Sequence, residues 1–143
     1  SVIEAFDGLG AKNGRFSVQF TTDSRYIVDG LTSWVFGWAR NGWKRKTGPI
    51  ENLALWHDAI GAVDGHEVSW QWVKGHAGHP QNEYANDLAV KAATELSASG
   101  GFIDSGFDAW LEARRAKGGA RAAVAAFPDG ERFKAAPSLP RVS

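Results

Sequence analysis

Asp23 and His76 are the two side chains whose types and positions in this sequence best suit chemistry. Asp23 ends the segment RFSVQFTTD, in which apolar and polar residues alternate as they do in a half-buried strand. His76 follows the segment HEVSWQWVKG, which alternates in the same way. If right-handed crossovers make the two strands parallel, their carboxyl ends meet at one edge of a sheet, where open α/β sheets bind ligands. The sequence therefore predicts one cleft that contains both the carboxylate and the imidazole.

Each of these residues also has an ordinary structural explanation. Asp23 is equally a candidate N-cap for a helix that begins at Ser24. His76 and His79, combined with an acid from the following helix, have only weakly metal-like spacing, so two solvated loop histidines are the favoured interpretation. A histidine in a glycine-flanked loop suits mobile proton transfer better, and this is the role we predict for His76.

Asn82, Asn86 and Asp87 lie in the first turns of a helix that we predict to begin near Pro80. Asn82 and Asn86 are one turn apart and share a face, whereas Asp87 is rotated by about 100° from Asn86. Only one of the two neighbours can therefore point at a given ligand. On their own, these residues favour local capping by Asn82 and a favourable contact of Asp87 with the positive helix start.

The elements around these residues follow from hydrophobic periodicity and turn signals. The predicted helices span residues 1–10, 24–30, 32–40, 53–63 and 80–96. The buried face of the last helix is predicted to consist of Ala85, Leu88, Ala89 and Ala92. Beyond Ser97 the composition shifts to Gly, Ala and Ser, with one short helix through Trp110 and Leu111. We expect a domain over residues 1–96 and a partly flexible Gly/Ala-rich extension over residues 97–143.

Aromatic and basic residues are interleaved in the segment WARNGWKRK, residues 38–46, which contains no acid. Its cations are Arg40, Lys44, Arg45 and Lys46. Trp34, Trp38 and Trp43 adjoin these cations, where stacking on a nucleic acid and simple packing are equally good explanations. Trp56, Trp70 and Trp72 fit the predicted core faces and are interpreted as packing residues.

The bulk composition narrows the function classes. The 143 residues carry a formal net charge of zero, so an affinity for nucleic acid would depend on the local basic segment. Cysteine is absent, which excludes disulfides, thiolate zinc sites and a cysteine nucleophile, and cytoplasm is the expected compartment. We see neither a membrane span nor a secretion signal. His57 and His66 belong to no constellation and are expected at the surface.

Three segments in this order and spacing closely resemble bacterial type 1 ribonuclease H: TTDSRYIVDGLTSWVFGWARNGWKR, PIENLALW and WQWVKGHAGHPQNEYANDLA. The resemblance covers residues 1 to about 94. It implies an α/β fold with a mixed sheet flanked by helices, and metal-dependent hydrolysis of the RNA strand of RNA/DNA hybrids. Mg²⁺ is the implied metal, with Mn²⁺ as an alternative. We expect a monomer that binds the hybrid and no membrane.

The resemblance also implies roles for individual residues. Asp23 matches the family's central metal-binding aspartate, and His76 matches a loop histidine that assists proton transfer or product departure. The segment from Leu31 to Arg45 resembles the basic protrusion that grips the DNA strand, with Trp34 as a stacking residue. Asn52 matches a polar contact to the hybrid backbone. The implied substrate-binding set is Trp34, Trp38, Arg40, Trp43, Lys44, Arg45, Lys46 and Asn52.

The sequence departs from the family pattern at two places. Asn86 stands where the family has its fourth metal carboxylate, and Asp87, the next residue, is a substitute candidate only if the helix turns or slides. An amide oxygen coordinates Mg²⁺ without adding charge, so we expect weaker metal binding. The family's first three strands, with an aspartate and a glutamate of the metal site, correspond to positions before Ser1, and Glu4 lies too late to be that glutamate.

The sequence therefore favours an RNA/DNA hybrid endonuclease that uses two-metal-ion catalysis, provided that an amino-terminal segment supplies the remaining ligands. The alternative is a catalytically impaired module that binds hybrids or other nucleic acids. A structural module attached through the Ala-rich tail is the third hypothesis.

Overall fold

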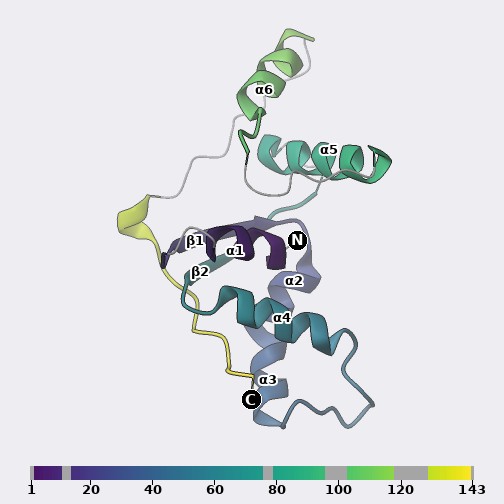
Figure 1. Ribbon diagram of the computed structural model, residues 1–143, viewed down its shortest axis with the longest axis vertical. Helices are drawn as coiled ribbons and strands as arrows, with labels where there is room; N and C mark the ends of the chain where they lie inside the picture. Colours follow the sequence, from purple (N-terminus) through teal and green to yellow (C-terminus); the bar gives the residue numbers. More distant parts are fainter. Residues whose placement is uncertain (1, 11–13, 76–78, 96–102, 118–128, 143) are drawn as a thin grey trace. The chain divides into compact units, whose positions relative to one another are not determined.

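The computed structural model describes residues 2–10, 14–75, 79–95, 103–117 and 129–142. The chain divides into two compact units, one from residues 1–72 and 128–143 and the other from residues 73–127 (Figure 1). Each unit is described by itself below. Within the described residues, no helix combines the length and the apolar character that a membrane span requires.

A parallel pair of strands, β1 (Ser17–Thr22) and β2 (Glu67–Trp72), forms the sheet of the first unit. Val18 is paired with Val68, and Phe20 with Trp70, so apolar side chains gather on one face. The other face is polar, and there the Gln19 side-chain amide donates to Gln71 Oε1 over 2.6 Å. The predicted alternation and parallel pairing are confirmed, as is the predicted α/β class with helices flanking a sheet. Among the described residues the sheet contains only these two strands.

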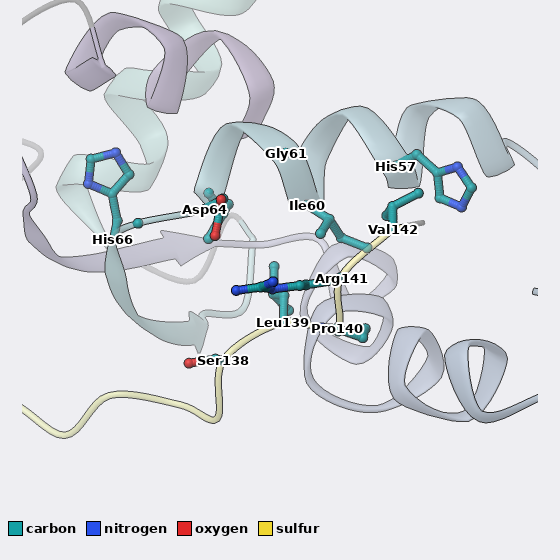
Figure 2. Close-up of a pocket in the computed structure, with 12 residues that line it drawn as sticks. His57, Ile60, Gly61, Asp64, His66, Ser138, Leu139, Pro140, Arg141 and Val142 are labelled. Atoms are coloured by element: carbon teal, nitrogen blue, oxygen red, sulfur yellow. The ribbon is translucent and has the colours of Figure 1, made fainter.

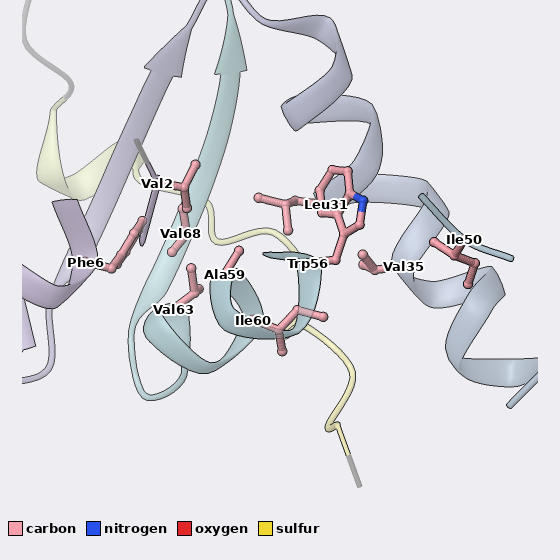
Figure 3. Packing of buried hydrophobic residues seen from close by; sticks show 10 residues of the cluster. All are labelled: Val2, Phe6, Leu31, Val35, Ile50, Trp56, Ala59, Ile60, Val63 and Val68. Carbon is pink, nitrogen blue, oxygen red and sulfur yellow. The ribbon is translucent and has the colours of Figure 1, made fainter. Parts of the chain in front are cut away.

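Helices α1 (Val2–Gly10) and α4 (Leu53–Val63) supply much of the core on the apolar face of this sheet (Figure 3). Phe6 of α1 is almost completely buried, and its ring centroid lies 6.0 Å from that of Phe20 and 6.1 Å from that of Trp70. α4 buries Trp56, Ala59, Ile60 and Val63, which recur at the three- and four-residue spacing of one helix face. Both helices were predicted from the sequence, and α4 has the predicted bounds.

Between the strand β1 and the helix α4, the chain forms one continuous helical stretch. It consists of α2 (Arg25–Asp29), a π-helical turn η1 (Gly30–Trp34) and α3 (Val35–Arg40). The predicted break between two separate helices near residue 31 is wrong, because Gly30 adopts an ordinary helical conformation with φ −60° and ψ −50°. Glycine is needed there for space: a Cβ on Gly30 would lie 2.0 Å from the Trp56 ring.

The C-terminal segment, residues 129–142, belongs to the first unit. It begins with a short 3₁₀ turn, η2 (Gly130–Arg132), and continues without regular structure. Ala136 N–H donates to the Val68 carbonyl of β2 over 2.8 Å, and Leu139 packs against the core. This segment therefore returns to the sheet, while the predicted boundary at residue 97 stays a prediction.

The second unit contains α5 (Pro80–Glu95) and α6 (Phe107–Ala116). Pro80 is the first residue of α5, as predicted, and His79 Nδ1 caps the helix by accepting from Asn82 N–H over 3.1 Å. The short helix predicted through Trp110 is α6, which packs on α5 through Tyr84. Within its own unit, α5 leaves Leu88 43% exposed and Ala85 and Ala89 exposed, so α6 does not cover the apolar face predicted for this helix.

Candidate functional site

Asp23 lies directly after β1 and is exposed. It does not cap the following helix: the N-cap of α2 is Ser24, whose hydroxyl oxygen accepts from Ile27 N–H over 3.3 Å. The capping role that the sequence left open for Asp23 is therefore filled by its neighbour. The carboxylate is left at the carboxyl end of the strand, available to a ligand.

The main chain of Asp23 is held by Trp72, the last residue of β2. The Trp72 indole N–H donates to the Asp23 carbonyl oxygen over 2.9 Å, and the Arg25 guanidinium lies 4.0 Å from the centroid of the Trp72 ring. The interpretation of Trp72 as a core residue is wrong, because it is 37% exposed and stands at the strand end. The sequence contained one signal for this exposure: Trp72 is the last residue of the alternating segment, where a side chain can extend past the packed part of the sheet.

The remaining members of the predicted catalytic set lie in the second half of the chain. His76 falls outside the described residues. Asn86 is exposed on α5, in the second unit, whereas Asp23 belongs to the first, and each unit is described separately. Asp87 is engaged, because its Oδ2 accepts from the Trp110 indole N–H over 3.1 Å. His79, considered with His76 as a metal ligand, uses Nδ1 to cap α5.

The chemistry of these donors fits a hard divalent cation. The Asp23 carboxylate and the Asn86 amide are both exposed oxygen donors, the class of ligand that Mg²⁺ prefers. Within the part of the chain that the structure describes, no three His, Cys, Asp or Glu residues gather into a metal cluster. The described residues therefore include oxygen donors that suit Mg²⁺, but they form only part of a complete set of metal ligands.

Four aromatic rings form a continuous cluster, named here the aromatic platform: Tyr26, Trp34, Trp38 and Trp56. Trp34 lies at its surface, 38% exposed, with its ring centroid 5.4 Å from that of Tyr26 and 6.2 Å from that of Trp38. Trp56 lies beneath, buried, with its centroid 5.2 Å from Tyr26. The platform is therefore supported by the core and exposes an indole on which a base or sugar can stack.

The basic loop, residues 41–52, follows α3, and its cations are not equivalent. Lys44 and Lys46 are exposed. Arg45 is also exposed, but its guanidinium donates to the Pro49 carbonyl over 2.7 Å and so helps to shape the loop. Trp43 is half-buried with φ 62°, and its ring lies 4.7 Å from that of His57 in an edge-on contact. Trp43 therefore has a packing role, and the cations near it include one structural arginine.

Asn52 links the basic loop to the aromatic platform. It precedes α4 in a left-handed conformation, φ 56° and ψ 30°, which asparagine tolerates better than most residues. Its side chain makes no capping hydrogen bond, and its Nδ2 lies 3.5 Å from the Tyr26 hydroxyl. The predicted backbone-contact residue is thus exposed beside the platform. Arg40, at the end of α3, is exposed as well.

A pocket of about 400 Å³ lies elsewhere in the first unit, between the end of α4, the turn to β2 and the C-terminal segment (Figure 2). Its lining includes His57 and His66 but no residue of the predicted site. Both histidines are half-buried, so their expected surface positions are wrong. His66 Nδ1 accepts from Phe16 N–H over 3.0 Å, and its ring contacts Phe6 and Phe16. These two histidines serve packing.

Comparison with known proteins identifies the class. The RNase H family profile matches residues 1–94, and the chain therefore belongs to the RNase H family. The resemblance seen in the sequence is thereby confirmed, and α6 and the C-terminal segment lie beyond the matched part.

Relatives in two bacteria support this assignment. The Ribonuclease H of Neisseria gonorrhoeae is 46% identical over 92 residues, which cover 64% of this chain and 63% of the relative. The Ribonuclease H of Erythrobacter litoralis is 49% identical over 90 residues, 62% of each chain. This chain thus spans less than two thirds of the length of these relatives.

A solved structure is also similar: LC9-RNase H1, described as a type 1 RNase H with the type 2 active-site motif. The match has a TM-score of 0.92 and 58% sequence identity, and covers 100% of this chain and 67% of LC9-RNase H1. The RNase H fold is therefore the fold of this chain.

Proposed function

We propose that this chain forms part of an endonuclease that hydrolyses the RNA strand of RNA/DNA hybrids. The observation that carries the proposal is Asp23, an exposed carboxylate at the end of β1 that is not used as a cap. Its main chain is tied to the end of β2 by Trp72. Asp23 lies in the segment that matches the RNase H family.

In this proposal, Asp23 and Asn86 bind the metal and His76 handles a proton. Asp23 would contribute a charged oxygen and Asn86 a neutral one, so Asp23 would attract a cation more strongly than Asn86. Bound Mg²⁺, or Mn²⁺ in its place, would polarise the phosphodiester and lower the pKa of the attacking water. The mobile proton of an imidazole suits protonation of the leaving oxygen by His76.

In the same proposal, the aromatic platform, the basic loop and Asn52 bind the hybrid. Trp34 offers a stacking surface, while Lys44 and Lys46 add salt-sensitive attraction to phosphates. Trp38, Trp43 and Arg45 support these surfaces from within. Contacts to 2′-hydroxyls would distinguish the RNA strand.

Asn86 in place of a carboxylate is compatible with catalysis in this proposal. The similar structure LC9-RNase H1 is described as a type 1 RNase H with the type 2 active-site motif, so this fold accepts a change of active-site motif. The proposal further takes the protein to act as a monomer in the cytoplasm, a compartment that suits a chain without cysteine.

A second candidate, a module that binds hybrids without cutting them, is favoured by the loss of charge at Asn86. The two candidates differ in cleavage and not in binding. An experiment that measures both therefore separates them.

The test is cleavage of an end-labelled RNA/DNA hybrid in Mg²⁺ by the full chain, with binding of the same hybrid measured in parallel. Asp23→Asn should reduce cleavage by more than about 100-fold while binding persists, because a metal ligand is removed. Asp58→Asn, which neutralises an exposed aspartate of α4, is the matched control and should cut normally. Binding without cleavage by the parent chain would select the non-catalytic module.

A further inference from the structure

The peptide group between Asp23 and Ser24, named here the clamped peptide, has both of its polar atoms held by side chains. The parallel ladder ends one residue earlier, at the pair of Thr22 with Trp72. Beyond that pair, the Trp72 indole N–H donates to the Asp23 carbonyl oxygen over 2.9 Å. Ser24 N–H, the donor of the same peptide group, donates to Thr22 Oγ1 over 3.1 Å. Two side chains therefore hold the main chain just past the end of the sheet.

The Trp72 indole is itself held by polar and cationic partners. It is 37% exposed, and among the described residues the hydrophobic core and its packed neighbours include Trp70 but not Trp72. The guanidinium of Arg25, the first residue of α2, lies 4.0 Å from the centroid of the Trp72 ring. One contact acts on the face of the ring and the other on its N–H. The orientation of the indole therefore depends on these contacts more than on the core.

The clamped peptide determines where the Asp23 carboxylate can lie. Strand pairing at Thr22 fixes the main chain before Asp23, and the clamped peptide fixes it afterwards. Once both main-chain torsions are set, the Cα–Cβ bond has one direction and the side chain has only a few staggered rotamers. Within the described residues, no hydrogen bond or ion pair holds the carboxylate itself. Its position therefore depends on the main chain.

We propose that Trp72 is a positioning residue, which holds the clamped peptide and so keeps the Asp23 carboxylate in the orientation that binds the metal. This inference rests on the proposed function, because it requires Asp23 to be a metal ligand. Every residue that it uses belongs to the first unit. A hydrogen bond to the main chain here performs the task that a partner of the ligand side chain often performs at metal sites.

The test compares variants of the full chain by Mn²⁺ binding, followed by electron paramagnetic resonance, and by hybrid cleavage at increasing Mg²⁺ concentration. Trp72→Phe keeps a ring for Arg25 and removes the donor to Asp23. It should weaken Mn²⁺ binding by about threefold to tenfold and raise the Mg²⁺ concentration for half-maximal cleavage in proportion, with the KM for hybrid unchanged. A loss of folded protein would instead lower cleavage equally at every Mg²⁺ concentration.

The matched control is Gln71→Leu. It removes the hydrogen bond with Gln19, one residue before Trp72 on β2, and does not touch the clamped peptide. Gln71 is exposed, and the variant should bind Mn²⁺ and respond to Mg²⁺ as the parent does.

Thr22→Val tests the other side of the clamped peptide. It keeps the shape of the side chain and removes the acceptor for Ser24 N–H, so it should repeat the effect of Trp72→Phe in part. This variant also serves if Trp72→Phe does not fold, which circular dichroism would show.

The possible failures are distinguishable. If Trp72→Phe and Thr22→Val both bind Mn²⁺ as the parent does while Asp23→Asn loses binding, the inference fails alone. If Trp72→Phe raises the KM for hybrid and leaves Mn²⁺ binding unchanged, Trp72 contacts the hybrid and the inference is overturned. If the parent neither binds Mn²⁺ nor cuts, or if Asp23→Asn does both as the parent does, the inference and the proposed function fail together.

Discussion

Asp23 and Ser24 are sequence neighbours with separate tasks. Ser24 caps α2, a contact that stabilises a helix by about 0.5–2 kcal/mol, so Asp23 need not do so. Trp72 takes the Asp23 carbonyl and leaves its carboxylate exposed. At this scale, the Asp23 carboxylate stays exposed and uncommitted to the cap because Ser24 and Trp72 make the structural contacts around it.

Asn86→Asp tests the role of the amide as a ligand. The added negative charge should lower the Mg²⁺ concentration for half-maximal cleavage by about threefold or more, because charged oxygens bind the cation more strongly. A titration of cleavage rate against Mg²⁺ measures it. An unchanged Mg²⁺ dependence would mean that residue 86 does not face the metal.

At the scale of elements, the helical stretch from α2 to α3 meets α4 at one close contact. Gly30 lies directly against Trp56, and a Cβ there would lie 2.0 Å from the indole. A π-helical turn begins at the same residue, and such turns mark places where a helix departs from its regular path. The contact thus determines how closely the two helical elements approach.

Gly30→Ala should therefore destabilise the protein, by about 1–3 kcal/mol, through overpacking against Trp56. Gly61→Ala is the matched control, since Gly61 is an exposed helical glycine of α4 with nothing within 4 Å of the added Cβ. It should leave stability unchanged or raise it by up to about 1 kcal/mol. Urea unfolding measures the free energy of unfolding of both variants. Equal values for Gly30→Ala and Gly61→Ala would contradict a close contact between Gly30 and Trp56.

If the basic loop binds phosphates, the affinity for the hybrid should depend on salt concentration. Lys44→Gln with Lys46→Gln should weaken hybrid binding and flatten the slope of log K against log salt by about 1 for each phosphate that the loop no longer neutralises. Arg45 is left intact because it holds the loop through the Pro49 carbonyl. Lys117→Gln, at the end of α6, is the control. The same slope in the double variant and the parent would remove the loop from the binding surface.

The sequence predicted elements whose signal is local and periodic. The alternation around Phe20 and Trp70 identified both strands and their parallel pairing, and the three- and four-residue spacing in α4 identified that helix. The continuous path through Gly30 was missed, because glycine signals a break while its helical backbone here depends on a distant partner, Trp56. Local patterns do not contain information on such contacts.

The site residues stay a prediction. The structure confirms that Asp23 follows a strand, and the residue lies within the part of the chain that matches the family. That Ser24 would cap the helix, that His79 would cap α5, and that Trp72 would hold a carbonyl could not be inferred, since several neighbouring residues were chemically able to do each task. The three-dimensional structure determines which of several chemically suitable neighbours makes each contact.

At the scale of the whole molecule, the chain returns to its first unit near its end. Ala136 N–H binds the Val68 carbonyl of β2, and Leu139 reaches the core. The Gly/Ala-rich composition of the region gave no periodic signal for this contact, which involves few side chains. The C-terminal segment therefore protects one edge position of the sheet.

Ala136→Pro should reduce the free energy of unfolding by about 1 kcal/mol, because proline removes the N–H that Val68 accepts from. Ala136→Ser keeps the donor and serves as the control. Thermal unfolding compares the two variants, and identical midpoints would show that this hydrogen bond contributes nothing to stability.

Trp56 belongs both to the core and to the aromatic platform, so the platform exists only in the folded chain. A nucleic acid that stacks on the platform binds only the folded chain, so it raises the free energy of unfolding. At a concentration of 100 times its Kd, the increase is about 2.7 kcal/mol. A substitution in the core beneath Trp56 lowers the apparent affinity only where it leaves a measurable fraction of the chain unfolded, because the unfolded chain has no platform to bind with.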